Sequence, residues 1–98
     1  MKKKIAILGS TGSIGKSLID IILKDRKNFE VKLLTANKNY RVLYNQAKLL
    51  NVKNIIITDK RSFDLFKKKR ISKKFKIFNN FKNLKKILTN KVDYSMSS

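Results

Sequence analysis

The sequence predicts an α/β fold with a doubly wound parallel sheet that is incomplete at the C-terminus. Apolar runs and amphipathic stretches alternate along the chain in the order strand, helix, strand, helix, strand, helix. That order is typical of a parallel sheet whose strands are joined by right-handed crossovers. All three glycines fall in a single loop after the first predicted strand, and the last residues resemble the beginning of another strand.

The first half of the chain predicts two strands and two helices. "KIAILG", residues 4–9, is an apolar run without strict alternation, as expected for a central strand buried on both faces. "FEVKLLTA", residues 29–36, predicts the second strand. The helix between them should run from Ser13 to near Asp25. Its predicted buried stripe follows the i, i+4, i+7, i+8 spacing and comprises Ile14, Leu18, Ile21 and Ile22. A second helix should carry Val42, Leu43, Ala47 and Leu50.

A third strand and a third helix follow. "NIIIT", residues 54–58, is rich in β-branched side chains and predicts a buried strand. The helix after it is expected from Arg61 to about Arg70, with Phe63 and Phe66 as its apolar positions.

The remaining residues predict an edge strand, a fourth helix and an unfinished strand. "KFKIF", residues 74–78, alternates in the manner of a short edge strand. Asn80 is a suitable cap for a helix over residues 81–88, whose apolar side holds Leu84, Ile87 and Leu88. "VDYSMSS" then begins a strand that stops at Ser98. This ending predicts that residues 1–98 are one part of a longer protein.

The composition excludes several classes of function. A chain of 98 residues makes one small domain at most. Without cysteine or histidine it has no disulfides, usual zinc sites, thiol nucleophiles or histidine acid–base chemistry. No apolar stretch is long enough to span a membrane and no secretory leader is visible, so we expect a soluble cytoplasmic protein with no membrane partner. The acids are dispersed, so we assign no catalytic residue and no metal ligand; they are Asp20, Asp25, Glu30, Asp59, Asp64 and Asp93.

The formal net charge of +19 raises the alternative of a small basic module that binds nucleic acid or another polyanion. The lysines are spread along the chain together with many Asn and Ile residues, which favours compositional drift over a selected binding surface. The basic run that begins at Lys67 is most simply a solvated helix end and loop. Aromatic side chains that could stack on bases have the spacing of core residues; they are Phe63, Phe66, Phe75 and Phe78. A nucleic acid partner is therefore disfavoured.

The glycine loop "GSTGSIG" predicts a phosphate site at the start of the first helix. Helix amino termini bind anions through backbone N–H groups and the helix dipole. The triphosphate loop G-x-x-x-x-G-K-[ST] fails by one residue, because Ser10 stands where its first glycine belongs. The dinucleotide pattern G-x-G-x-x-G fits with one extra residue, giving Gly9, Gly12 and Gly15 the roles of tight turn, close approach to a pyrophosphate and close helix packing. A tight turn without a ligand is the simpler alternative.

The end of the second strand favours NADPH over NADH. Domains that use NAD place an acid there to bind the ribose 2′-hydroxyl. Here the sequence is "TANKN", in which Lys38 could attract a 2′-phosphate and no carboxylate repels it. The competing interpretation is that Lys38 is one more lysine of a basic chain.

The stretch "KIAILGSTGSIGKS", followed in register by "LIDII" and "FEVKLLTANKN", resembles the N-terminus of the 1-deoxy-D-xylulose 5-phosphate reductoisomerase family. The resemblance implies a Rossmann-like fold in which residues 1–98 form part of an N-terminal NADPH-binding domain, with the catalytic and C-terminal domains absent. It implies cofactor contacts at Gly9, Thr11, Gly12, Ser13, Ile14, Asn37, Lys38 and Asn39. Asn37 replaces a common family glycine and would be the least costly substitute if the backbone were left-handed there.

The resemblance also implies what the whole family does. Its members convert 1-deoxy-D-xylulose 5-phosphate to 2-C-methyl-D-erythritol 4-phosphate in the non-mevalonate isoprenoid pathway. They use hydride from NADPH and a divalent metal, Mg or Mn, and are expected to be homodimers. The metal ligands and the sugar-phosphate site lie beyond Ser98 in the family pattern, so this chain alone should be inactive and should bind NADPH weakly or not at all. Another NADP-dependent oxidoreductase with a similar loop, such as a semialdehyde dehydrogenase, is the remaining alternative.

Overall fold

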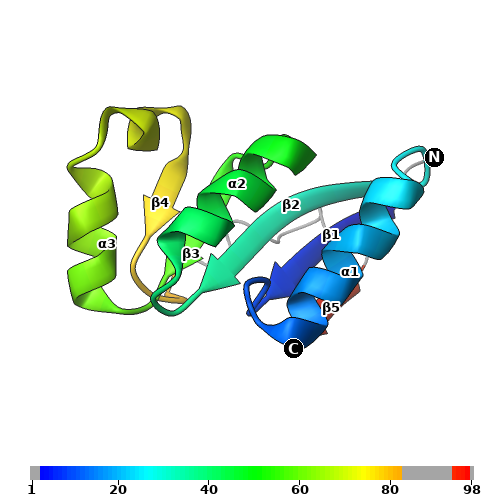
Figure 1. Cartoon of the computed structure of the whole chain (residues 1–98), viewed down its shortest axis with the longest axis horizontal. Helices are drawn as coiled ribbons and strands as arrows, with labels where there is room; N and C mark the ends of the chain where they lie inside the picture. The colour runs from blue at the N-terminus through cyan, green and yellow to red at the C-terminus, as the bar shows by residue number, and fades with distance from the viewer. Residues whose placement is uncertain (1–2, 83–93, 98) are drawn as a thin grey trace.

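A computed structural model describes residues 3–82 and 94–97, and its strands form one five-stranded sheet in the order β4-β3-β2-β1-β5 (Figure 1). Every neighbouring pair of strands is parallel. The predicted α/β fold class is therefore confirmed. The strands are β1 (Lys3–Leu8), β2 (Phe29–Ala36), β3 (Asn54–Ile57), β4 (Lys76–Phe78) and β5 (Tyr94–Ser97).

Three α-helices and a short 3₁₀-helix connect the described strands. They are α1 (Ser13–Lys24), α2 (Tyr40–Leu50), α3 (Lys60–Lys67) and η1 (Arg70–Lys74). The third helix ends earlier than predicted, because the buried Ser72 hydroxyl donates to the carbonyl oxygens of Lys67 (3.0 Å) and Lys69 (2.7 Å) and closes the chain into a tighter turn. Most of the predicted helix over 81–88 lies outside the described residues. Among the helices that are described, none has both the length and the apolar character needed to cross a membrane.

The strand order reverses beside β1. The chain leaves β1 for β2, β3 and β4 on one side and comes back to β5 on the other side. Open parallel sheets bind ligands outside the carboxyl ends of the strands at such a reversal. The glycine loop directly follows β1 and so stands at this point of the fold. The predicted edge strand over 74–78 is confirmed in shortened form, because β4 is the outermost strand beyond β3.

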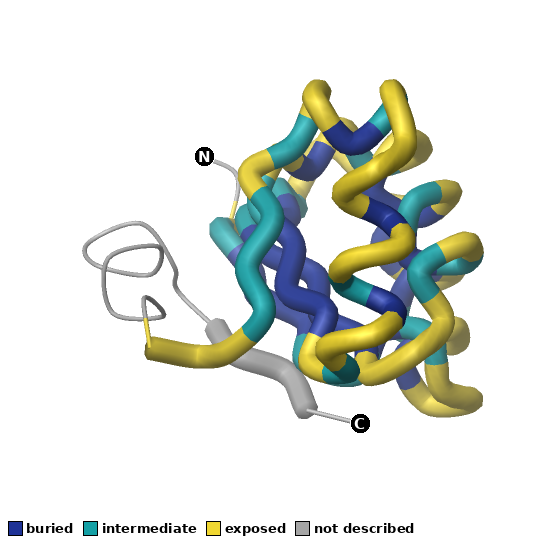
Figure 2. The backbone as a smooth tube through the Cα atoms, turned by 90° about the vertical axis from the view of Figure 1, so that its left-hand side faces the viewer, coloured by how far each residue is buried: buried dark blue, intermediate teal, exposed yellow. Residues whose placement is uncertain are grey.

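Most of the buried side chains lie between the sheet and its helices. Figure 1 shows α1 and α2 on one face of the sheet, and Figure 2 shows the central strands largely buried and the outward helix turns exposed. This main core includes residues from β1 to α3, namely Ile5, Ile7, Ile19, Ile22, Val31, Leu34, Leu43, Ala47, Ile55, Ile57 and Phe66. A smaller cluster joins Ala6, Leu33 and Ile56, and Leu8 and Phe78 pack against it. The central strands are thus buried on two faces, as their continuous apolar runs predict.

The predicted buried stripe of α1 is confirmed at Ile22 and in part at Leu18, which packs against the core, but it is wrong at Ile14 and Ile21. The buried residues of the helix are Gly15, Ile19 and Ile22, whereas Ile14 is 63% exposed and Ile21 is 59% exposed. Both stripes follow helical spacing, so periodicity alone could not separate them. Gly15 decides between them, because the helix turns its smallest residue toward the loop backbone that it must approach.

An aromatic cluster joins α2 to α3 and η1. The Phe66 side chain is fully buried, and its ring centroid lies 5.6 Å from that of Tyr40, 6.2 Å from that of Tyr44 and 6.4 Å from that of Phe75. Of the four rings predicted to be core residues, Phe66 is buried, and the other three are partly buried against the core: Phe63, Phe75 and Phe78. Phe63 is partly buried, and its ring lies 5.3 Å from the ammonium groups of both Lys60 and Lys67. This packing disfavours the nucleic-acid alternative, whose stacking surfaces would have to be exposed.

Candidate functional site

The loop between β1 and α1 makes a turn that needs glycine. Gly9 has φ 73, in the left-handed region where a side chain is strained. The Gly12 amide donates to the Gly9 carbonyl oxygen at 3.2 Å, and Gly12 then begins α1 as its N-cap residue without any side chain to cap the helix. The predicted turn role of Gly9 is confirmed. The amino end of α1 is left open on the side where the loop faces solvent.

Gly15 is the point of closest approach between the helix and the loop. A Cβ atom placed on Gly15 would lie 2.5 Å from the Gly9 carbonyl oxygen and 2.6 Å from both the carbonyl carbon and the Cα of Ser10. These are backbone atoms, which cannot swing aside as the end of a side chain can. The predicted close-packing role of Gly15 is confirmed, with the loop as its partner.

Two buried polar residues hold the loop from behind. The Thr35 hydroxyl accepts from the Gly9 amide at 2.8 Å, and the Thr35 carbonyl accepts from the Ser10 amide at 2.9 Å. The Gln46 side chain accepts from the Ser10 hydroxyl at 2.7 Å and donates to the Ser10 carbonyl at 2.8 Å. The sequence interpretation missed Ser10, Thr35 and Gln46. A polar residue on the apolar stripe of α2, between Leu43 and Ala47, is the signal that could have identified Gln46.

A cavity of about 440 Å³ opens at this loop. It brings together six of the eight residues predicted to contact a cofactor: Gly9, Thr11, Gly12, Ser13, Ile14 and Asn37. The exposed Ile14 residue lines this cavity, so its side chain is available to a ligand. The positive end of α1 faces the same opening, and an anion placed there would be stabilised by the helix dipole.

The two remaining predicted residues, Lys38 and Asn39, follow Asn37 and form with it a ledge, residues 37–39, beside the cavity. Asn37 is fixed by the next loop of the sheet, since its side-chain oxygen accepts from the Thr58 hydroxyl at 2.9 Å and its carbonyl accepts from the Asp59 amide at 3.0 Å. Asn39 caps α2, because its side-chain oxygen accepts from the Val42 amide at 3.3 Å. Among the described non-glycine residues Asn51 alone has a positive φ, so Asn37 needs no left-handed backbone. Lys38 is exposed and lies outside the lining of the cavity.

One acid lies near the ledge, which the sequence interpretation did not foresee. Asp59 follows β3, yet its carboxylate is close enough to Lys38 for the two charges to interact. Hydrogen bonds from the Ser62 hydroxyl (2.7 Å) and the Ser62 amide (3.0 Å) are the main causes that lower the pKa of the Asp59 carboxyl below its ordinary 3.8, and the charges of Lys38 and Arg61 add to them. The acid is thus occupied as the cap of α3.

The Asp59 cap predicts a specific response to acid. Because the folded-state pKa lies below the ordinary 3.8, the charged carboxylate stabilises the fold above that pH, and the stabilisation is lost as the pH falls through the folded-state pKa. Asp59→Asn retains a good capping residue but cannot titrate. We therefore expect the two proteins to have similar melting temperatures at neutral pH. The melting temperature of the unsubstituted chain should fall further than that of Asp59→Asn between about pH 6 and about pH 3.

Thermal unfolding followed by circular dichroism at a series of pH values measures this difference. Asp20→Asn, at an exposed position of α1, is the control and should keep the acid sensitivity of the unsubstituted chain. Parallel pH profiles for Asp59→Asn and the unsubstituted chain would contradict the assignment.

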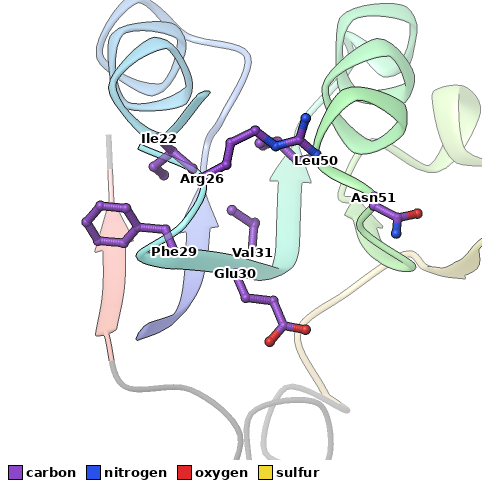
Figure 3. Close-up of a pocket in the computed structure, with 7 residues that line it drawn as sticks. All are labelled: Ile22, Arg26, Phe29, Glu30, Val31, Leu50 and Asn51. Atoms are coloured by element: carbon purple, nitrogen blue, oxygen red, sulfur yellow. The ribbon is translucent and has the colours of Figure 1, made fainter. Parts of the chain in front are cut away.

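A second cavity of about 270 Å³ lies at the opposite end of the sheet (Figure 3). It is lined by residues around the start of β2 and the ends of α1 and α2, namely Ile22, Arg26, Phe29, Glu30, Val31, Leu50 and Asn51. Glu30 is paired with Lys32 at 2.6 Å. This cavity lies at the amino ends of the strands and shares no residue with the glycine loop. Within residues 3–82 and 94–97, no three acids, cysteines or histidines gather in a way that could hold a metal ion.

Comparisons with known proteins agree with this geometry. A profile described as 1-deoxy-D-xylulose 5-phosphate reductoisomerase matches residues 5–98. The enzyme of that name from Pelagibacter ubique strain HTCC1062 is 58% identical over a 96-residue alignment that covers 96% of this chain and 25% of that protein. Among solved structures, the reductoisomerase from Zymomonas mobilis in complex with NADPH matches with TM-score 0.63 and 28% identity, over 99% of this chain and 21% of that one.

A further crystal structure, of DOX-P reductoisomerase in complex with magnesium, matches with TM-score 0.82 over 97% of this chain and 24% of that one; its 23% identity supports the fold alone. The chain spans about a quarter of the length of the Pelagibacter relative. Because the profile match runs from Ile5 to Ser98, the chain belongs to the 1-deoxy-D-xylulose 5-phosphate reductoisomerase family.

Proposed function

We propose that this chain is the NADPH-binding part of a reductoisomerase that converts 1-deoxy-D-xylulose 5-phosphate to 2-C-methyl-D-erythritol 4-phosphate. The observation that carries the proposal is the glycine loop, which turns at a left-handed Gly9, packs on Gly15 and opens into a cavity at the reversal of the strand order. The family membership of the chain and the NADPH complex of the Zymomonas relative support it.

The residues of the cavity fit the phosphates of a dinucleotide. The amides of Ser13 and Ile14 lie at the amino end of α1, where no side chain caps the helix, so they can donate to phosphate oxygens. The hydroxyls of Thr11 and Ser13 are further donors, and Gly12 has no side chain to keep a pyrophosphate away. When bound, NADPH supplies the hydride of the family reaction. The role of this chain is to hold and orient it.

The ledge fits the adenosine end of the cofactor. Asn37 and Asn39 hold two loops in place through the bonds described above, and the Lys38 ammonium group is free to reach a 2′-phosphate. The Asp59 carboxylate is close enough to Lys38 for their charges to interact. Ser62 donates hydrogen bonds to that carboxylate, and the positive charge of Arg61 partly balances its negative charge. The sugar-phosphate substrate, the Mg or Mn ion and a homodimer partner belong, under this proposal, to a complete cytoplasmic enzyme of which these residues are about a quarter.

Titration with NADPH is the direct test of the binding role. Amide NMR spectra of the isotope-labelled chain should shift at residues 11–14 and 37–39 as NADPH is raised into the millimolar range, while amides around Phe29 and Asn51, at the second cavity, stay in place. Weak affinity is expected for so short a piece. Shifts centred on the second cavity would contradict the proposal, and if the isolated piece shows no shift, a hybrid with the Pelagibacter enzyme decides.

A graft tests the catalytic part of the proposal. The aligned part of this chain can replace the aligned quarter of the Pelagibacter enzyme, to which it is 58% identical. The hybrid should reduce 1-deoxy-D-xylulose 5-phosphate with NADPH, whereas residues 1–98 alone should show no turnover. A folded hybrid that cannot oxidise NADPH would count against the assignment.

Lys38→Ala predicts a change in cofactor preference. Loss of a charge-assisted hydrogen bond to the 2′-phosphate should weaken NADPH binding about tenfold and leave NADH binding nearly unchanged. The same NMR titration measures both dissociation constants. Lys24→Ala removes an equal charge from an exposed position in the last turn of α1 and should reduce NADPH binding far less. Equal effects of the two variants would mean that the basic character of the chain, rather than Lys38, attracts the cofactor.

A further inference from the structure

We propose that Gln46 is a positioning residue for the glycine loop, acting on cofactor affinity through Ser10 without touching the cofactor. The inference rests on the proposed function. Gln46 lies in the middle of α2, one layer behind the loop, and is absent from the lining of the cavity. Its side chain nevertheless makes two hydrogen bonds to the residue between Gly9 and Thr11.

The contact is buried and uses both ends of the amide. Ser10 is 0% exposed, Thr35 3% and Gln46 6%. The Gln46 Oε1 atom accepts from the Ser10 hydroxyl at 2.7 Å, and the Nε2 atom donates to the Ser10 carbonyl at 2.8 Å. Two bonds from one planar group to a side-chain atom and a main-chain atom of the same residue fix the position and the orientation of Ser10. Thr35 holds the adjacent backbone from β2.

Packing alone does not account for this glutamine. The position lies on the buried side of α2 beside Leu43 and Ala47, where an apolar side chain of similar length would fill the same space. A buried amide costs free energy unless its polar atoms are paired. Ser10 satisfies Gln46 here, and among the described side chains no buried polar atom lacks a hydrogen-bond partner. The pair therefore adds little net stability while it specifies where the loop lies.

The loop position matters for binding because Ser10 is continuous with the phosphate-facing residues. Thr11 and Gly12 follow Ser10 directly, and Gly15 packs against the Ser10 backbone from the other side. A loop held at both points is preorganised, so a ligand does not have to order it on binding. Without Gln46 the Gly15 contact and the Thr35 bonds remain, and the loop gains freedom at Ser10. The loss of affinity should therefore arise entirely at the pyrophosphate, which NADPH and NADH share.

Gln46→Met tests the inference, since methionine keeps the length and removes both hydrogen bonds. NMR titrations of the full 98-residue chain should give dissociation constants about tenfold higher for both NADPH and NADH, with an unchanged ratio between them. Lys38→Ala changes that ratio, so the two roles are separable. Leu43→Val is the matched control: it disturbs the same buried side of α2 without touching the loop, and should lower the melting temperature while leaving the dissociation constants of the folded chain unaltered.

Other outcomes are equally informative. If Gln46→Met does not fold, the titration of Ser10→Ala decides, because this variant removes one of the same hydrogen bonds from the loop side. If both variants fold, the double variant should bind no more weakly than Gln46→Met. Wild-type affinity in Gln46→Met or in Ser10→Ala, or weakening by Leu43→Val of the same size, overturns the inference and leaves the proposed function standing. If the unsubstituted chain binds too weakly to measure, the same variants are titrated in the hybrid with the Pelagibacter enzyme, and failure of that hybrid to bind NADPH overturns both.

Discussion

Gly15→Val should cost the chain roughly 3 kcal/mol of its free energy of unfolding, at the upper end of what overpacking causes. The first added carbon already meets the Gly9 carbonyl oxygen at 2.5 Å and two Ser10 backbone atoms at 2.6 Å. Relief requires α1 to move away from the loop, which would pull Ile19 and Ile22 out of the main core. Urea unfolding followed by circular dichroism measures the loss.

Gly15→Ala is a more stringent test of the same contact, because helix propensity predicts an increase in the free energy of unfolding and packing predicts a decrease. Alanine in a helix interior is about 1 kcal/mol more favourable than glycine, so a chain without the contact should become more stable. We expect a loss instead. Ser17→Ala, at an exposed position of the same helix, combines the propensity effect with the loss of one exposed hydrogen bond from the Ser17 hydroxyl to the Ser13 carbonyl (3.2 Å), and should be close to neutral. An increase in stability for Gly15→Ala would show that the loop does not lie where the structure places it.

The sheet and the glycine loop could be predicted because their signals are local. Strands buried on both faces require continuous apolar runs, and residues 4–9, 29–36 and 54–58 supply them. Gly9 and Gly15 were recognised from their spacing, which reflects backbone requirements at the two positions themselves. The structure confirms both requirements. Requirements that arise within a short stretch of the chain can be recognised from the sequence without knowledge of partners that are distant along it.

The errors concern partners that are distant in sequence. The rotation of α1 is the exception, because it depends on the contact of Gly15 with nearby Ser10, and period alone could not distinguish Ile14 and Ile21 from Ile19. The polar layer behind the loop joins residues 25 and 36 positions apart, and the sequence interpretation assigned no role to Gln46. Asp59 escaped notice near Lys38 because it follows a different strand. In these other cases the sheet topology makes the meeting possible.

The ledge depends on more than its own residues. Asn39 caps α2 and Tyr40 begins it. The position of residues 37–39 therefore depends on the position of the first turn of that helix. Tyr40 packs on Phe66 with ring centroids 5.6 Å apart. The aromatic cluster therefore supports the ledge through the first turn of α2, although none of its rings lines the cavity. Its members are Tyr40, Tyr44, Phe66 and Phe75.

Phe66→Ala should accordingly be the most damaging truncation in the core, with an expected loss of about 3 to 5 kcal/mol. Phe66 heads the fully buried side chains by volume and has three aromatic neighbours that could not close around the space it leaves. Many domains of this size have a stability of about 5 to 15 kcal/mol, so the variant should be partly or wholly unfolded at physiological temperature. Urea unfolding at low temperature keeps the folded state measurable.

The neighbouring residue provides the control for this prediction. Leu65 is 45% exposed, so Leu65→Ala removes an apolar side chain from the same turn of α3 at a cost of less than about 1 kcal/mol. Phe66→Leu, which refills much of the volume without a ring, should fall between the two. Where Phe66→Ala still folds, amide spectra should shift at Tyr40 and along residues 37–39 more than at residues 9–12, because the cluster supports α2 and not the glycine loop. Comparable losses for Leu65→Ala and Phe66→Ala would mean that α3 is not anchored by this ring.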